Sequence, residues 1–148
     1  YVHIFFKALD FADDNNNLPL FTNLTHLEIG VNNCYGWKWL PDLINSMPNL
    51  VNLVLKMDLR DEYGEESNWM EPQSFPTSLL LQLDEIILSG IKGHKDDLEL
   101  IKYVLENVAV LNKMTIDTCK LGLKLVTEFL QSHGVFRRGS KTCQIKLY

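Results

Sequence analysis

A six-position phrase of apolar residues recurs four times along this 148-residue chain. Large apolar side chains stand at the first, fourth and sixth positions of each copy, and successive copies begin 26, 33 and 28 residues apart. The four copies are Leu24-x-x-Leu27-x-Ile29, Leu50-x-x-Leu53-x-Leu55, Leu83-x-x-Ile86-x-Leu88 and Leu111-x-x-Met114-x-Ile116. A unit of this length cannot bury its apolar face alone, so the copies must stack on one another. The recurrence therefore predicts a solenoid with one short strand in each repeat.

Three segments outside the phrases have helical periodicity. A short helix is expected at 37–44, and its apolar face includes Ile44 and Met47. A second helix follows Asp96 or Asp97, either of which is a suitable cap. Its apolar stripe comprises Leu98, Ile101, Leu105 and Val108. The third helix is expected at 121–132, with Leu125, Val126, Phe129 and Leu130 on its core side.

Residues 140–148 are expected to close the chain as a strand, with Cys143, Ile145 and Leu147 inward. Residues 1–9 are apolar and are expected to finish an upstream repeat. Strands and helices that alternate in this way form a parallel sheet backed by helices. The spacing is typical of leucine-rich repeats, so we predict an α/β fold with a leucine-rich-repeat-like solenoid.

Period-2 alternation indicates which strand side chains face away from the core. The displayed positions are His26, Glu28, Asn52, Val54, Lys56, Glu85, Ile87, Ser89, Lys113, Thr115, Asp117, Gln144 and Lys146. Their charges are mixed, which favours a protein or peptide ligand over a polyanion. We predict that the protein-binding residues are the central ones: Glu28, Asn52, Val54, Glu85, Ile87 and Lys113.

The net charge of −5 is concentrated in one segment. Six acidic residues and a single arginine lie between Asp58 and Glu71, and the segment also contains Gly64 and Pro72. We predict a long acidic loop at 59–78, for which a functional role and disorder both remain open. Trp69 within it is a candidate binding anchor.

Composition argues against two classes of partner. The chain has no basic stripe beyond Arg137, Arg138 and Lys141, which we interpret as a solvated turn, so no nucleic-acid partner is predicted. No apolar run approaches the roughly 18 residues that a spanning helix needs, so no membrane partner is predicted either.

The sequence contains no motif for nucleotide binding, and neither a C-x-x-C pair nor an H-E-x-x-H motif for zinc. The four histidines, His3, His26, His94 and His133, are far apart and are expected at the surface. We therefore predict no catalytic, cofactor-binding or metal-binding residues, and no enzymatic activity. Folding can bring a distant nucleophile and base together, but nothing in the sequence indicates that it does.

The three cysteines are odd in number and widely spaced, which favours a reducing compartment and a cytoplasmic or nuclear location. Cys119 and Cys143 are predicted to be buried core thiols. The chain starts at Tyr1 rather than at methionine, so we expect a portion of a longer protein or a truncated gene product.

The stretch from Trp69 to Tyr148 resembles the FBD domain of plant F-box proteins, and the repeats before it resemble the leucine-rich region that precedes that domain. The matching segments are Trp69-x-Glu71-Pro72, Phe75-Pro76-x-x-Leu79-Leu80, residues 98–107, residues 110–116 and Ser140-x-x-Cys143-Gln144-Ile145. The family commonly has a cysteine where Ser78 stands here. The resemblance implies leucine-rich repeats at 1–58, the acidic loop at 59–78 and an FBD domain at 79–148 that continues the solenoid. Because most residues of the matching segments face inward, this domain either closes the solenoid as a cap or has a separate binding role.

The resemblance also implies a function. The chain is expected to be the substrate-recognition end of an F-box subunit of an SCF-type ubiquitin ligase, which binds an unknown target protein. A Skp-type adaptor and a cullin would be reached only through an upstream F-box, which is missing from this sequence. The alternative is a stand-alone leucine-rich-repeat interaction module, or a truncated gene product, with no ligase role. An extracellular receptor ectodomain is a third possibility, but it predicts a signal peptide and disulfide-bonded caps that the sequence lacks.

Overall fold

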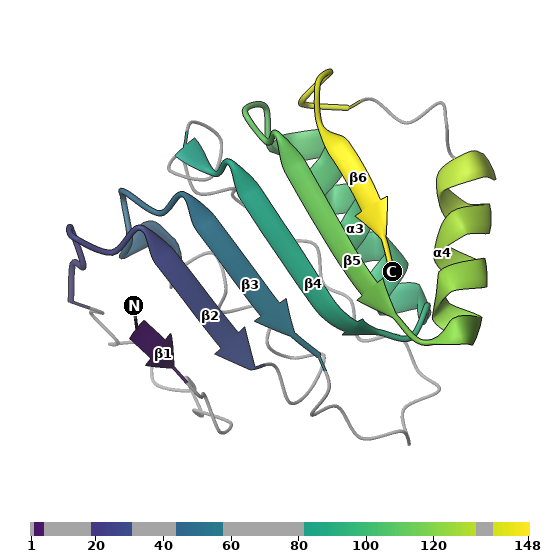
Figure 1. Cartoon of the computed structure of the whole chain (residues 1–148). Helices are drawn as coiled ribbons and strands as arrows, with labels where there is room; N and C mark the ends of the chain where they lie inside the picture. The colour runs from purple at the N-terminus through teal and green to yellow at the C-terminus, as the bar shows by residue number, and fades with distance from the viewer. Residues whose placement is uncertain (1, 5–18, 31–43, 58–81, 133–137) are drawn as a thin grey trace.

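The protein forms a parallel six-stranded sheet with helices on one side. The structure is a computed structural model that describes residues 2–4, 19–30, 44–57, 82–132 and 138–148. The strands follow one another across the sheet in chain order, and every neighbouring pair is parallel (Figure 1). They are β1 (Val2–Ile4), β2 (His26–Gly30), β3 (Asn52–Lys56), β4 (Glu85–Ile91), β5 (Lys113–Thr118) and β6 (Gln144–Leu147).

The recurring phrases form the sheet and set its register. The fourth position of each phrase pairs with the fourth position of the next, and the sixth pairs with the sixth, as Leu27 with Leu53 and Ile29 with Leu55. β6 continues both rows through Ile145 and Leu147. The inward residues of β2 to β5 are between 0% and 2% exposed, which confirms the predicted core side of these four strands.

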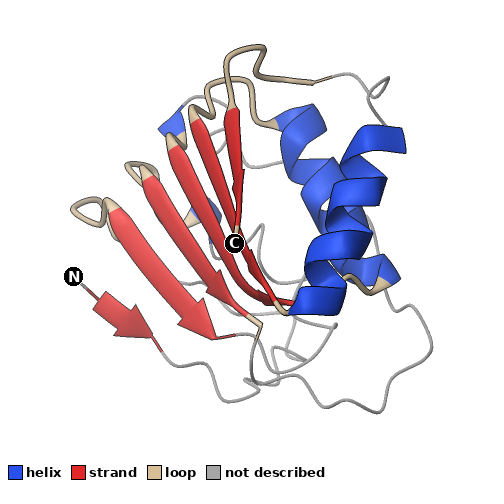
Figure 2. Ribbon diagram, turned by 45° about the vertical axis from the view of Figure 1, so that its right-hand side comes forward, coloured by secondary structure: helices blue, strands red, loops and turns tan. Residues whose placement is uncertain are grey.

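Helices α3 (Lys95–Asn107) and α4 (Lys120–Ser132) lie on the same side of the sheet (Figure 2). α4 begins one residue before its predicted span, whereas α3 begins at Lys95, ahead of both predicted cap residues. α3 buries Leu100, Ile101, Val104 and Leu105, whereas Leu98 of the predicted stripe is only partly buried. Parallel strands backed by helices are the α/β class that the sequence predicts.

The start of α3 corrects the predicted cap. His94 occupies the cap position, and Asp97 lies inside the first turn. The Asp97 carboxylate nevertheless accepts hydrogen bonds from the backbone N–H groups of Lys92, Gly93 and His94, at 3.0, 3.0 and 3.2 Å. Its side chain is fully buried, so a single carboxylate fixes both the β4–α3 loop and the orientation of the helix.

α4 is held against the β4–α3 loop by two close backbone approaches. A Cβ atom on Gly122 of α4 would lie 2.7 Å from the Ile91 carbonyl oxygen. Gly93 has a φ of +81°, and a Cβ atom there would lie 2.8 Å from the Leu125 side chain. Both positions therefore require glycine, for space at the first and for space and backbone conformation at the second.

The two described cysteines differ from one another. Cys143 is buried as predicted, and this burial raises the pKa of its thiol above the usual 9.0, against the opposing charge of Arg138. The prediction that Cys119 is a buried core thiol is wrong, because Cys119 is exposed. It falls between the end of β5 and the start of α4, where its Sγ atom accepts the Gly122 N–H at 3.4 Å instead of entering the core.

Several expectations concern residues outside the described ranges. These are residues 37–43 of the helix predicted at 37–44, the acidic loop at 59–78 with Trp69, His133 and Arg137. Among the described residues, β6 begins at Gln144 and is shorter than the predicted strand at 140–148. β1 pairs with β2 in parallel, in agreement with a preceding repeat at the start of the chain.

Replacement of Gly122 by alanine tests the close approach of α4. In an ordinary helix interior this change stabilises by about 0.5–1 kcal/mol. Here the new methyl group meets backbone atoms, so we expect Gly122→Ala to lower the free energy of unfolding by about 1–3 kcal/mol in chemical denaturation. Lys124→Ala, at an exposed position of the same helix, is the matched control and should change it by less than about 0.5 kcal/mol. A stabilising effect of Gly122→Ala would contradict the observed packing.

Candidate protein-binding face of the sheet

The sheet face opposite the helices brings all six predicted binding residues together. Glu28, Val54 and Ile87 are register partners on β2, β3 and β4. Asn52, Glu85 and Lys113 are register partners on β3, β4 and β5. Neighbouring strands lie about 4.8 Å apart, and side chains on one face repeat every two residues. The six residues thus form two adjacent rows of three, which we call the outer-face block.

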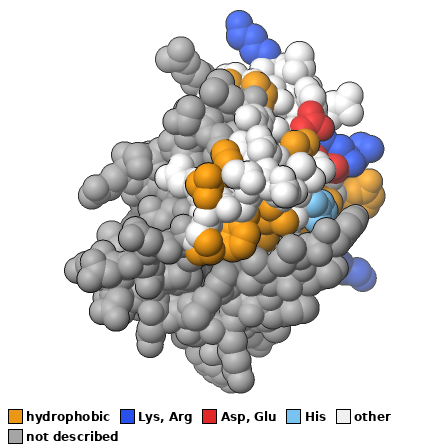
Figure 3. All heavy atoms as spheres, turned by 90° about the vertical axis from the view of Figure 1, so that its left-hand side faces the viewer, with side chains coloured by type: hydrophobic (Ala, Val, Ile, Leu, Met, Phe, Trp, Pro, Cys, Tyr) orange, Lys and Arg blue, Asp and Glu red, His pale blue; other side chains and the backbone are white. Residues whose placement is uncertain are grey.

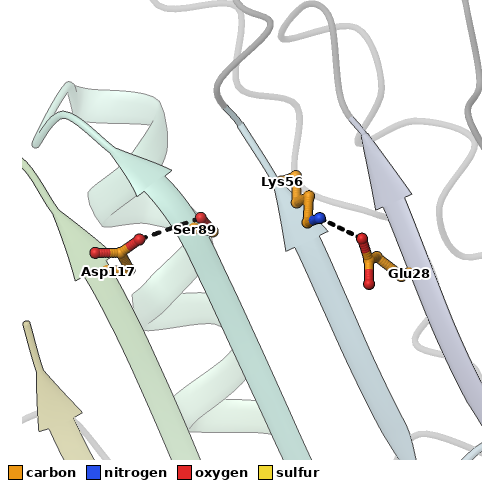
Figure 4. Close-up of polar contacts among 4 residues, drawn as sticks. All are labelled: Glu28, Lys56, Ser89 and Asp117. Carbon is orange, nitrogen blue, oxygen red and sulfur yellow. Dashed lines mark hydrogen bonds and ion pairs between the residues drawn. The ribbon is translucent and has the colours of Figure 1, made fainter.

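Two ion pairs across neighbouring strands involve residues of this block. The Lys56 ammonium pairs with the Glu28 carboxylate, as Figure 4 shows, and the Lys113 ammonium lies 2.6 Å from a Glu85 oxygen. The hydrogen bond that Lys113 donates to the Glu85 carboxylate, and the attraction of that charge, raise the pKa of Lys113 above the usual 10.5. The two pairs join β2 to β3 and β4 to β5 across the outer face.

A third polar contact lies farther along the sheet. The Ser89 hydroxyl donates a hydrogen bond of 3.3 Å to the Asp117 carboxylate, from β4 to β5 (Figure 4). Glu28, Glu85 and Asp117 are balanced on this face by Lys56, Lys113 and Lys146. The outer face consequently has no dominant charge, as the alternation pattern predicts.

The centre of the outer-face block is apolar. Val54 and Ile87 are direct neighbours on β3 and β4, and Thr115 continues the same row on β5. Ile87 is partly exposed, but Val54 is only 9% exposed, although its position points away from the core. Val54 stands in register between Glu28 and Ile87, both of which have longer side chains. The sequence predicts the correct face for Val54 but overestimates the exposed fraction of its side chain.

Sequence reasoning did not identify the cross-strand pairing of these charges. Glu28 and Lys56 are 28 residues apart, and so are Glu85 and Lys113. The recurrence of opposite charges one repeat apart is a signal that the sequence contains. It becomes informative only when the register is known, because Lys56 is the direct register partner of Gly30 and reaches Glu28 along the strand.

No group of three or more histidine, cysteine, aspartate or glutamate side chains among the described residues is arranged to hold a metal ion. No helix in the described ranges is long and apolar enough to cross a membrane. Of the predicted surface histidines, His94 is exposed before α3 and His26 lies on the outer face of β2.

The β1 side of the molecule exposes hydrophobic side chains, unlike the mixed-charge outer face. Figure 3 shows hydrophobic side chains gathered there, beside the undescribed residues drawn in grey. Leu20 and Phe21 are 66% and 39% exposed and belong to the segment before β2. The large exposed apolar residues of this segment are therefore separate from the outer-face block.

Comparison with known proteins gives the class of this protein. Residues 71–116, which extend through β4 and α3 and end within β5, match the FBD family. An F-box/FBD/LRR-repeat protein of Arabidopsis thaliana is 32% identical over 86% of this chain and 27% of its own length. An FBD-associated F-box protein of the same plant is 30% identical over 95% of this chain and 30% of its own length. F-box/LRR-repeat protein 13 is 36% identical over 67% of this chain and 21% of its own length.

The chain thus contains an FBD domain, and its homologues are the plant F-box/FBD/LRR proteins. It spans less than a third of the length of these relatives. No solved structure matches it. α4 and β6 lie beyond the matched range but pack on it, since Gly122 contacts Ile91 and the Gly139 N–H donates to the Leu105 carbonyl at 2.8 Å.

Two substitutions on β3 test the unequal exposure within the outer-face block. Val54→Ala removes largely buried methyl groups, so we expect it to lower the free energy of unfolding by about 1–2 kcal/mol. Asn52→Ala lies on the same strand and face and should change it by less than about 0.5 kcal/mol. Urea denaturation of both variants measures the difference. Equal effects would show that Val54 is no better packed than Asn52.

Proposed function

We propose that this chain is the target-recognition part of an F-box subunit of an SCF-type ubiquitin ligase, and that the outer-face block holds the target protein. The observation that carries the proposal is the alignment of the six residues in two register rows on an open sheet face. The two ion pairs give this face a charge pattern, and the apolar residues between them give it contact area. The relatives are F-box proteins that also carry FBD or leucine-rich-repeat regions, which supports the ligase context.

The mode of action is binding without bond formation. A receptor of this kind raises the effective concentration of its target near the ligase, and the transfer chemistry takes place on other subunits. The adaptor and the cullin would be contacted through an F-box outside these 148 residues. A cytoplasmic or nuclear location is part of the same proposal.

We further propose that the sheet is the end of a leucine-rich-repeat solenoid. Support comes from strands that follow in chain order, each parallel to the last and in register with it. In this arrangement residues 1–58 are repeats, 59–78 form the acidic loop, and 79–148 are the FBD domain that continues the solenoid.

The second candidate is an interaction module with no ligase role. The same outer-face block supports it, because target binding does not require an F-box. An F-box encoded in frame upstream in the transcript would favour the ligase subunit over this alternative.

Quantitative capture from plant extract tests the binding face. The bait is this chain, compared with the combined variant Asn52→Ala, Glu85→Ala and Ile87→Ala. We expect a specific protein to be retained by the wild type and reduced about tenfold or more with the variant, because central interface contacts dominate binding energy. The double variant Lys124→Ala and Glu128→Ala, on exposed α4 positions, should retain it fully.

Two results of this capture would contradict the proposal. An unchanged set of captured proteins with the outer-face variant, at unchanged thermal stability, would place binding elsewhere. Recovery of the adaptor by this chain alone would show that ligase docking does not need an F-box.

Removal of residues 121–148 tests whether the end of the chain acts as a cap. The deletion removes most of α4 and all of β6, and so uncovers the inward side chains of β5, Met114 and Ile116, which are 0% exposed. We expect the shortened protein to be insoluble, or to lose its cooperative thermal transition. A soluble product that still unfolds cooperatively would show that the cap is dispensable.

A further inference from the structure

The outer edge of β6 has backbone groups directed away from the sheet. The Gln144 N–H donates to the Asn112 carbonyl at 2.9 Å, and the Tyr148 N–H donates to the Ile116 carbonyl at 3.0 Å. Because alternate residues of a strand point their backbone groups to opposite sides, the groups of Ile145 and Leu147 face away from β5. Within the described part of the chain, β6 is paired with β5 alone, and no further backbone hydrogen bond reaches Ile145 or Leu147.

The side chains of β6 differ between the two faces of this edge. Gln144 and Lys146 are exposed on the outer face of the sheet. Ile145 and Leu147 are half-buried on the helix side, packed against the core. An added strand would therefore meet a polar, basic row on one face and an aliphatic row on the other.

Charge is distributed unevenly between this end of the chain and the rest. Residues 113–148 contain seven basic and two acidic residues, whereas residues 1–112 contain seven basic and seventeen acidic ones. Arg138, Lys141 and Lys146 flank or belong to β6, and all three are exposed. No ion pair links Lys146 to another of the described residues. This edge is thus basic in a protein whose net charge is negative.

We propose that the free edge of β6 binds an extended segment of a partner protein in which acidic and aliphatic residues alternate. The segment adds a seventh strand by hydrogen-bonding to the outward backbone groups of Ile145 and Leu147. Its acidic side chains lie beside Lys146 on the outer face, and its aliphatic side chains lie beside Leu147 on the helix side. This site is distinct from the outer-face block and does not depend on the proposed function of that block.

A second copy of the chain fits this edge poorly. Pairing of two β6 edges about a twofold axis would bring the basic residues of one edge next to the same residues of the other. An acidic strand removes this repulsion and supplies the opposite charge. The complementarity therefore selects an acidic partner segment over self-association.

Titration of the whole chain with a labelled eight-residue peptide of alternating glutamate and valine tests the proposal. We expect saturable binding by fluorescence anisotropy. Amide exchange at Ile145 and Leu147 should slow on binding, while Lys146, whose N–H faces β5, should not change. Lys146→Glu should weaken binding by roughly fivefold, as expected for a cross-strand charge pair, and should favour a lysine–valine peptide. Lys95→Glu makes the same change in net charge at an exposed position of α3 and should leave binding unchanged.

Other outcomes would overturn the proposal. Equal binding of a peptide that is N-methylated at alternate residues would exclude strand addition, since such a peptide cannot form the ladder. Equal weakening by Lys95→Glu would show a response to net charge only. Binding of a single-stranded oligonucleotide that displaces the peptide, or sedimentation of the free chain as a dimer that the peptide dissociates, would identify a different occupant of the edge.

Discussion

Burial of two aliphatic rows across parallel strands is the interaction on which the rest of the structure depends. The rows run from Leu27 and Ile29 on β2 to Met114 and Ile116 on β5, with residues almost completely removed from solvent. Full burial of one such side chain contributes about 1.5–3 kcal/mol. A shift of one residue in any strand would turn its aliphatic side chains toward solvent, so this burial also fixes the register. The register in turn decides which polar residues become neighbours on the opposite face.

The outer-face block follows from this register. Glu85 and Lys113 are direct partners, and their ion pair exists because the aliphatic residues beneath them are aligned. The ion pairs on the exposed face add little to stability, but they hold charged groups in fixed positions around Val54 and Ile87. A face of this kind can discriminate between partners by charge and shape without any catalytic group.

Near the β6 end of the sheet, the structure depends on close contacts between α4 and the β4–α3 loop. α4 approaches the β4–α3 loop closely enough to require Gly122 and Gly93, and Asp97 secures that loop from inside α3. These contacts join α4 to the part of the chain that matches the FBD family. Among the described strands, β6 pairs with β5 alone, so its outer edge has no strand partner there. We infer that this end combines a covered inner face with a binding edge.

The sequence by itself determined strands β2 to β6, their inward residues and the six positions of the outer-face block, because alternation and repetition are local properties of the chain. It also located α4 to within one residue and predicted α3 with a start two to three residues too late. Only the tertiary structure decided that Cys119 is exposed, that Asp97 caps α3 from within, that Val54 is only 9% exposed and that, among the described strands, β6 pairs with β5 alone. Each of these features depends on distances between atoms from different strands, loops and helices. Such distances are set by the register and by the packing of α4, and local periodicity has no information about them.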